Sequence, residues 1–149
     1  MSTIMQDAAN GVVTEQFKTI AKKEGVTERF LMDGIASGRI VAPSNPNHDP
    51  IPSAIGEGMG IKVNVNLGTS RDMVCMDDEL KKLKVALDYG ADAVMDLSTG
   101  GDIDAIRATI LKECPVMTGS VPIYQIGLTA ARKMTSCWDS LTTTRSRTA

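Results

Sequence analysis

The stretch from Gly90 to Gly101 has the residue types of a loop that holds a substrate. Its apolar core, Ala93-Val94-Met95, runs directly into a small, polar segment that ends in two glycines, Ser98-Thr99-Gly100-Gly101. In α/β enzymes, such a segment follows the carboxyl end of a buried strand and faces the bound substrate. We therefore expect a functional site at this point of the chain.

Two polar residues lie at equal distances from this strand. Asn66 and Tyr124 each stand 29 positions from Met95, within the stretches 61–67 and 121–125. Equal spacing predicts three neighbouring parallel strands with these side chains at matching heights. Apolar and polar residues alternate along 61–67, which predicts one face toward the helices and a polar face toward the interior of a barrel.

Helical patterns connect these strands. Asp77 is the expected N-cap of a helix that Gly90 ends, and Asp102 is the expected N-cap of a helix that Pro115 ends. The order strand, helix, strand, helix, strand predicts an α/β fold with crossover helices on the outside of a parallel sheet.

The fold class that follows is an incomplete (β/α)₈ barrel, preceded by short N-terminal helices. A complete barrel needs about 250 residues, and this chain has 149. Residues 1–59 are expected to form a helical and loop segment, with Thr14 and Thr27 as N-caps, and residues 60–128 the first βα units. Residues 129–149 show neither helical nor strand periodicity, so we expect a divergent, disordered tail.

Composition narrows the function classes. With 42% hydrophobic residues, 23% charged residues and a net charge of −2, the chain favours neither nucleic acid nor a membrane as partner. Residues 1–10 have no features of a signal peptide, so a cytoplasmic location is expected. Cys75, Cys114 and Cys137 fit neither a metal knuckle nor a disulfide framework, which predicts reduced, inert thiols.

Several motifs together resemble a known family. They keep their order and spacing and lie at residues 26–30, 38–43, 45–48, 62–68, 89–100 and 119–125. The longest is Tyr89-Gly90-Ala91-Asp92-Ala93-Val94-Met95-Asp96-Leu97-Ser98-Thr99-Gly100. They resemble the phosphomethylpyrimidine synthases of thiamine biosynthesis, radical S-adenosylmethionine enzymes that convert aminoimidazole ribotide to hydroxymethylpyrimidine phosphate. The resemblance covers residues 11–125.

The resemblance implies a (β/α)₈ barrel with substrate at the carboxyl ends of the strands. It assigns substrate contacts to Asn66, Met95 and Tyr124, and no catalytic residue or metal ligand in this part. The Asn66 amide can donate to and accept from the edge of an imidazole or a ribose. The Met95 thioether can pack against a flat ring, and the Tyr124 hydroxyl group can position a polar substituent. Thr69 stands where the family usually has Asn.

The resemblance also implies cofactors and a partner. The family uses a [4Fe–4S] cluster, S-adenosylmethionine and zinc, and it forms a homodimer. The cluster is held by a Cys-x-x-Cys-x-x-x-x-Cys motif and the zinc by two downstream histidines, and this chain contains neither set. We therefore expect it to be inactive alone, and we expect His48 to be a hydrogen-bonding loop residue.

Three functions remain open at this point. The first is the N-terminal part of a phosphomethylpyrimidine synthase. The second is a non-catalytic remnant that binds a nucleotide or pairs with a full-length subunit. The third is a fragment of an unrelated βα-repeat aldolase or synthase. A Schiff-base lysine at a strand end would favour it, and Lys62 lies too early in its strand for that role. The segment 98–101 allows either a phosphate cradle or a tight turn.

Overall fold

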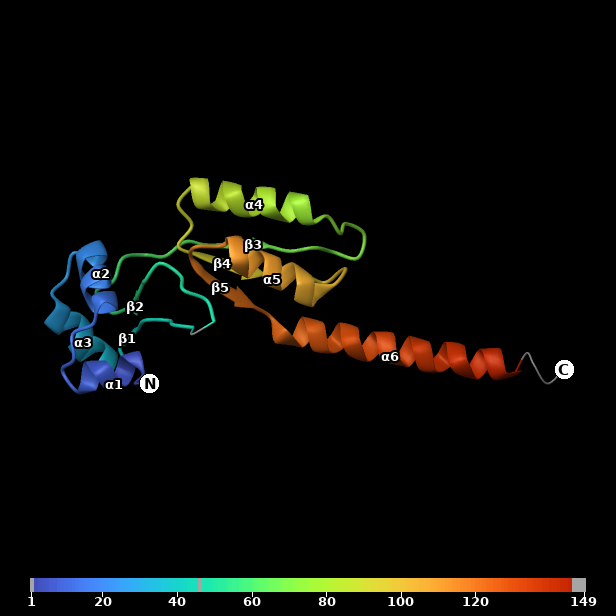
Figure 1. Ribbon diagram of the computed structural model, residues 1–149, viewed down its shortest axis with the longest axis horizontal. Helices are drawn as coiled ribbons and strands as arrows, with labels where there is room; N and C mark the ends of the chain where they lie inside the picture. Colours follow the sequence, from blue (N-terminus) through green and yellow to red (C-terminus); the bar gives the residue numbers. More distant parts are fainter. Residues whose placement is uncertain (1, 46, 146–149) are drawn as a thin grey trace.

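The structure, a computed structural model, describes residues 2–45 and 47–145. Six helices and five strands follow one another there. The helices are α1 (Ile4–Ala9), α2 (Glu15–Glu24), α3 (Glu28–Ala36), α4 (Met76–Asp88), α5 (Ile103–Glu113) and α6 (Pro122–Arg145), and the strands are β1 (Ile40–Val41), β2 (Ile55–Gly56), β3 (Asn64–Leu67), β4 (Ala93–Asp96) and β5 (Met117–Ser120). Figure 1 shows the N-terminal helices gathered at one end and α6 extending from the other.

The N-terminal part is a small helical unit closed by a short antiparallel ribbon. Thr14 and Thr27 accept from the backbone N–H three residues later, and both predicted N-caps are therefore confirmed. Strands β1 and β2 pair antiparallel beside these helices. The helices bury a shared core that includes Phe17, Ile20 and Leu31.

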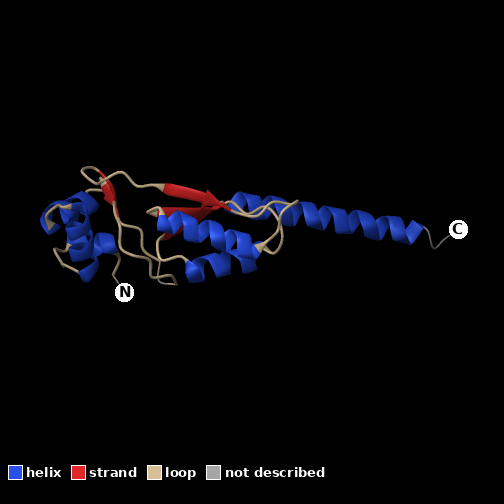
Figure 2. Ribbon diagram, turned by 90° about the horizontal axis from the view of Figure 1, so that it is seen from above, coloured by secondary structure: helices blue, strands red, loops and turns tan. Residues whose placement is uncertain are grey.

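The second part is a parallel sheet in the order β3-β4-β5. Figure 2 shows α4 and α5 on one face of this sheet. Leu67, Val94 and Ile110 belong to the core cluster between the strands and these helices. The predicted mixed α/β class with a three-stranded parallel sheet is confirmed.

The first strand is shorter than the sequence pattern predicts. Only Asn64–Leu67 is paired, because β4 begins at Ala93 and offers no ladder partner before Asn64. Ile61, predicted to face the helices, is 96% exposed. The predicted N-cap of α4 was also wrong, because the helix begins after Cys75 and Asp77 lies in its first turn.

The third strand lies earlier in the chain than predicted. β5 is Met117–Ser120, and residues 122–125 of the predicted strand form the first turn of α6 instead. Pro122 explains the difference, since proline cannot donate to a strand ladder but is favoured at the first position of a helix. The prediction of a strand through Tyr124 was wrong.

The predicted disordered tail also differs from the structure. The structure continues α6 to Arg145, so residues 129–145 are helical, and residues 146–149 lie outside the described part. The sequence from Gly127 to Ala131 contains no proline and carries Leu128, Ala130 and Ala131, which favour a helix. A helix started by Pro122 can therefore extend into a segment that lacks an amphipathic period.

Two carboxylates join the helical unit to the start of the sheet. Glu24 accepts from Gly60 N (2.8 Å) and from Lys62 Nζ (3.1 Å), and the side chain of Glu24 is 4% exposed. Asp92 accepts from Val63 N (3.0 Å) and from Lys23 Nζ (3.3 Å). These contacts fix the amino ends of β3 and β4 against α2.

Candidate substrate-binding site

Asn66 and Met95 lie side by side on the open face of the sheet. The parallel register pairs Asn66 of β3 with Met95 of β4, one residue before each strand ends. Asn66 is exposed and accepts from Asn64 Nδ2 (3.0 Å), and Met95 is partly buried. The predicted equal height of this pair, drawn from the 29-residue spacing, is confirmed.

Tyr124 does not lie at the same height. The residue beside Met95 on β5 is Gly119. Tyr124 lies five residues further on, in the first turn of α6, where its N–H donates to Val121 O (3.1 Å) and its side chain is 43% exposed. It therefore lies beyond the carboxyl end of β5. Its equal spacing in the sequence does not correspond to equal strand positions.

The loops after β3 and β4 continue side by side beyond the strands. Leu97 N donates to Leu67 O (2.8 Å), and Thr99 N donates to Thr69 O (2.8 Å). Gly68 has φ 145°, and a Cβ there would lie 2.6 Å from Ser98 N. Only glycine permits this approach, so the two loops form one rigid rim at the carboxyl end of the sheet.

Two buried carboxylates hold this rim from the helix side. Glu79 of α4 accepts from Gly68 N (2.8 Å) and from Lys82 Nζ (2.6 Å), and its side chain is 2% exposed. Asp96 Oδ1 accepts from both Ser98 N (3.0 Å) and Ser98 Oγ (2.5 Å). These carboxylates satisfy backbone groups that the ends of the strands leave unpaired.

A third set of polar contacts fixes the start of α6 against α5. Arg107 Nη1 donates to Gln125 Oε1 (2.9 Å), and Gln125 Nε2 donates to Asp104 Oδ1 (2.7 Å). Arg107 Nε also lies 4.0 Å from Asp96 Oδ2. No sequence pattern had indicated Glu79, Asp96 or Arg107 as part of the site. An acidic residue that directly follows an apolar strand core, as Asp96 does, was the available signal.

The segment 98–101 uses its polar groups internally. Ser98 Oγ donates to Asp96 Oδ1 and accepts from Thr69 N. Thr69 Oγ1 donates to Gly100 O (2.7 Å). Asp102 caps α5 by accepting from Ala105 N (3.1 Å), as predicted. These contacts are typical of a tight turn, which was one of the two interpretations that the sequence left open for residues 98–101. They also give Thr69 a structural partner at the position where the resembling family has Asn.

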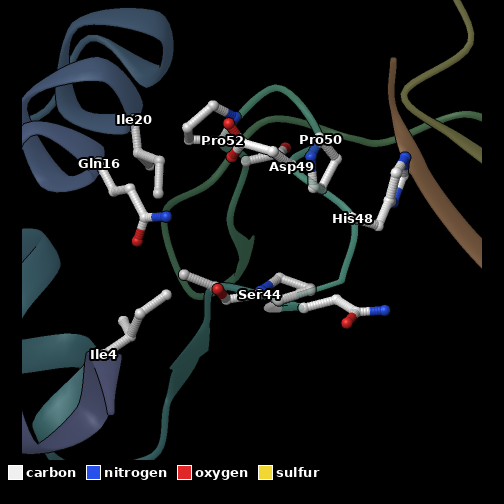
Figure 3. A pocket seen from close by; sticks show the side chains of 12 residues that line it. Ile4, Gln16, Ile20, Ser44, His48, Asp49, Pro50 and Pro52 are labelled. Atoms are coloured by element: carbon white, nitrogen blue, oxygen red, sulfur yellow. The ribbon is translucent and has the colours of Figure 1, made fainter. Parts of the chain in front are cut away.

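A hollow in the N-terminal part is too small for a substrate. Its volume is about 20 Å³, room for about one water molecule. Figure 3 shows Ile4, Gln16 and Ile20 on one side of it, with the proline-rich segment on the other and His48 directed away. His48 Nε2 donates instead to Cys114 O (2.8 Å), as expected for a hydrogen-bonding loop residue.

The described residues do not fit an iron–sulfur cluster or a zinc site. No group of three or more His, Cys, Asp or Glu side chains able to hold a metal ion occurs within residues 2–45 and 47–131. Cys114 is buried and donates to Val116 O (3.5 Å), and Cys75 is a free thiol. The side chain of Cys137 lies outside the described part. No helix among the described residues is long and apolar enough to cross a bilayer.

The comparisons with known proteins show the family of the chain. The chain matches the model of the Radical SAM ThiC family over residues 3–145. It belongs to this family.

Named relatives cover the same part of the chain. A phosphomethylpyrimidine synthase of Thermus thermophilus is 50% identical over 133 residues, which are 88% of this chain and 31% of the relative. The phosphomethylpyrimidine synthase of Pyrococcus furiosus is 50% identical over 124 residues, 83% of this chain and 29% of the relative. Phosphomethylpyrimidine synthase 1 of Methanosarcina mazei is 46% identical over 132 residues, 89% of this chain and 30% of the relative. The chain thus spans slightly less than a third of the length of these relatives.

Proposed function

We propose that this chain forms the first βα units of a phosphomethylpyrimidine synthase and supplies part of its substrate site. The reaction would convert aminoimidazole ribotide to hydroxymethylpyrimidine phosphate in thiamine biosynthesis. Family membership and the names of the relatives support this proposal. The main support for the proposed substrate site is that Asn66 and Met95 lie beside each other near the carboxyl ends of adjacent parallel strands.

The proposal includes a barrel that this chain does not complete. Three parallel strands in sequence order, with α4 and α5 on one face, match the start of a (β/α)₈ barrel. The outer edges of β3 and β5 have no strand beside them among the described residues. In a closed barrel, further βα units pair with both edges and enclose the face that carries Asn66.

In this proposal, the chain's own residues bind and orient the substrate. The Asn66 amide donates to and accepts from polar atoms of the imidazole or ribose, and Met95 packs against the flat ring. Tyr124, placed beyond the end of β5, orients a polar substituent with its hydroxyl group. A [4Fe–4S] cluster with S-adenosylmethionine would supply the radical in the complete enzyme, and zinc would be bound there. None of the described side chains provides a ligand set for these groups.

The proposed complete enzyme is a cytoplasmic homodimer that binds a small molecule and no nucleic acid. The net charge of −2 and the absence of a basic patch in the sequence support a small-molecule rather than a nucleic-acid partner. The mass of the assembled protein by light scattering tests the dimer.

A chimera tests the function directly. In this chimera, residues 2–131 of the chain replace the matching part of the Thermus thermophilus relative, and product formation from aminoimidazole ribotide is measured after cluster reconstitution. We expect turnover, and we expect Asn66→Ala to weaken substrate binding by about 1–3 kcal/mol, because a polar atom of the ring loses its partner. Asn10→Ala, at an exposed position at the end of α1, is the matched control.

Two outcomes would reject the proposal. One is a folded chimera with a full cluster that neither binds aminoimidazole ribotide nor forms product. The other is an Asn66→Ala chimera that binds the substrate as tightly as the unmodified chimera does, which would remove Asn66 from the site.

A further inference from the structure

A series of buried and partly buried polar contacts, with one open link, lies behind the open face of the sheet. It begins where Gly68 N donates to the Glu79 carboxylate. The next residue, Thr69, donates from its backbone N to Ser98 Oγ, and Ser98 Oγ donates to Asp96 Oδ1. From there it crosses to α5 at Arg107 and ends at Gln125 of α6. We call this set the rim network. It connects the segments that follow all three strands of the sheet.

Each proposed substrate residue is next to, or one residue removed from, a member of the rim network. Asp96 directly follows Met95, Gln125 directly follows Tyr124, and Gly68 follows Asn66 after one residue. Successive side chains of a strand point to opposite faces, so Met95 points to the open face and Asp96 to the helices. A shift of the network therefore moves the neighbouring substrate residue through the backbone.

One link of the network is not closed. Asp96 Oδ2 and Arg107 Nε are both buried and lie 4.0 Å apart, and neither has a hydrogen-bond partner among the described residues. The side chain of Asp96 is 1% exposed and that of Arg107 is 26% exposed. A charge-assisted hydrogen bond between such groups spans about 2.7–2.9 Å. A movement of about 1 Å would close the link and satisfy both atoms.

We propose that Asp96 and Arg107 are positioning residues whose contact sets the distance between Met95 and Tyr124 for substrate binding. Asp96 is joined by the chain to Met95, and Arg107 holds Gln125, the neighbour of Tyr124. Closing the link draws the end of β4 and the start of α6 together. The inference rests on the proposed function, because it needs Met95 and Tyr124 to contact the same substrate.

The test measures the Kd of aminoimidazole ribotide for the chimera described above and for its variants. We expect Asp96→Asn to weaken binding about tenfold, since the amide removes the negative charge that faces Arg107 Nε at 4.0 Å, while the ion pair of Arg107 with Asp104 (3.7 Å) stays. Asp88→Asn is the matched control, because Asp88 is an exposed carboxylate of α4 in an ion pair with Lys84 (2.6 Å). Thermal unfolding of each variant is followed in parallel.

A second variant keeps the test valid if Asp96→Asn does not fold. Gln125→Leu removes the contact with Arg107 without altering a buried carboxylate. We expect it to weaken binding when Tyr124 is present and to have no further effect in a Tyr124→Ala background, because it acts only through Tyr124. A purely structural role would give the same loss in both backgrounds.

The outcomes separate this inference from the proposed function. If the unmodified chimera does not bind aminoimidazole ribotide, the proposed function fails. If it binds, and Gln125→Leu and any folded Asp96→Asn leave the Kd unchanged, the positioning role alone is overturned. A loss of binding by Gln125→Leu that is equal with and without Tyr124 also overturns it.

Discussion

Met95 of β4 lies directly beside Gly119 of β5, and the absent side chain of Gly119 provides the space that the thioether occupies. A Cβ at position 119 would lie 3.0 Å from Met95 Sδ and 3.1 Å from its Cε. The small residue thus lets Met95 lie over the neighbouring strand on the open face. Its position on this face depends on a glycine that no sequence pattern indicated as part of the site.

Substitutions at Gly119 should therefore act through Met95. We expect Gly119→Ala to be tolerated, since the end of a flexible side chain can move by a few tenths of an ångström. Gly119→Val should displace the thioether and lower the free energy of unfolding by about 1–3 kcal/mol, the usual range for an overpacked site. Urea unfolding of the chain measures both values. Equal stability of the two variants would mean that Met95 does not occupy this space.

Alanine substitutions at Gly100 and at Gly127 should change the stability of the chain in opposite directions. A Cβ at Gly100 would overlap the backbone carbonyl of Ser70, which cannot move without opening the rim. Gly100→Ala should therefore destabilise the chain by about 1–3 kcal/mol. Gly127 lies within α6, and no atom of the described residues lies within 4 Å of its Cβ position. Gly127→Ala should raise helix stability by about 0.5–1 kcal/mol, because alanine loses less backbone entropy.

Circular dichroism melts of the two variants and the unmodified chain compare these changes directly. A Gly100→Ala chain as stable as the unmodified one would show that the loops after β3 and β4 are not in contact. A destabilising Gly127→Ala would count against α6 as a helix at this position.

Stability should fall in acid because of the two carboxylates that join the helical unit to the sheet. Although burial opposes ionisation, the Gly60 N–H and the Lys62 ammonium hold the pKa of Glu24 below its ordinary 4.5. The Val63 N–H, against partial burial and with help from Lys23, holds the pKa of Asp92 below its ordinary 3.8. A carboxyl whose pKa is lower in the folded state stabilises it above the unfolded pKa and loses this effect as pH falls through the folded pKa.

The measurement is the free energy of unfolding between about pH 6 and about pH 3. We expect it to fall below about pH 4.5, and to fall less in a Glu24→Gln/Asp92→Asn variant. Glu113→Gln, at an exposed position at the end of α5, is the control and should not change the slope. An identical acid slope in the double variant would show that these two carboxyls do not link the parts of the chain.

The sequence predicted most of the elements because their signals are local. Thr14, Thr27 and Asp102 cap helices as expected, since a cap depends on side chain and backbone within three residues. The pairing of Asn66 with Met95 was also predictable, because a helix between two strands fixes their relative offset. The 29-residue spacing to Tyr124 was misleading, since Pro122 turns the chain into a helix before that position is reached.

The rim network could not be predicted from these patterns. Its contacts join Glu79 to Gly68 and Arg107 to Gln125, and these pairs lie on elements whose relative placement follows only from packing. Asp96 illustrates the difficulty most clearly. Alternation along β4 places it on the buried side, where an acidic residue is unexpected, and only the three-dimensional structure shows Ser98 and Arg107 facing it.

The purified chain, supplied with iron and sulfide, should not assemble a cluster. A [4Fe–4S] cluster requires converging cysteine thiolates. Cys114 is buried, and its thiol donates to Val116 O. Cys75 lies directly before α4, so β4 separates the two cysteines in the sequence. The outcome is measured by the visible absorbance that arises from charge transfer between sulfide and iron, and by the iron content of the protein. Stoichiometric iron and sulfide bound to the chain would contradict the proposal that all cluster ligands lie in another part of the complete enzyme.

The outer edge of β3, which has no neighbouring strand among the described residues, should make the isolated chain self-associate. A groove of about 530 Å³ runs between this edge and α4, and its lining includes Val63, Val85 and Tyr89, which are 54%, 56% and 89% exposed. An unpaired strand edge beside exposed apolar side chains is a template for contact with another chain. We expect the mass measured by light scattering to rise with protein concentration. Val63→Lys/Val85→Lys should shift the chain toward monomer, whereas Val12→Lys, at a 49% exposed position in the N-terminal part, should not. A chain that is monomeric at every concentration would mean that this edge is protected in a way that the described residues do not explain.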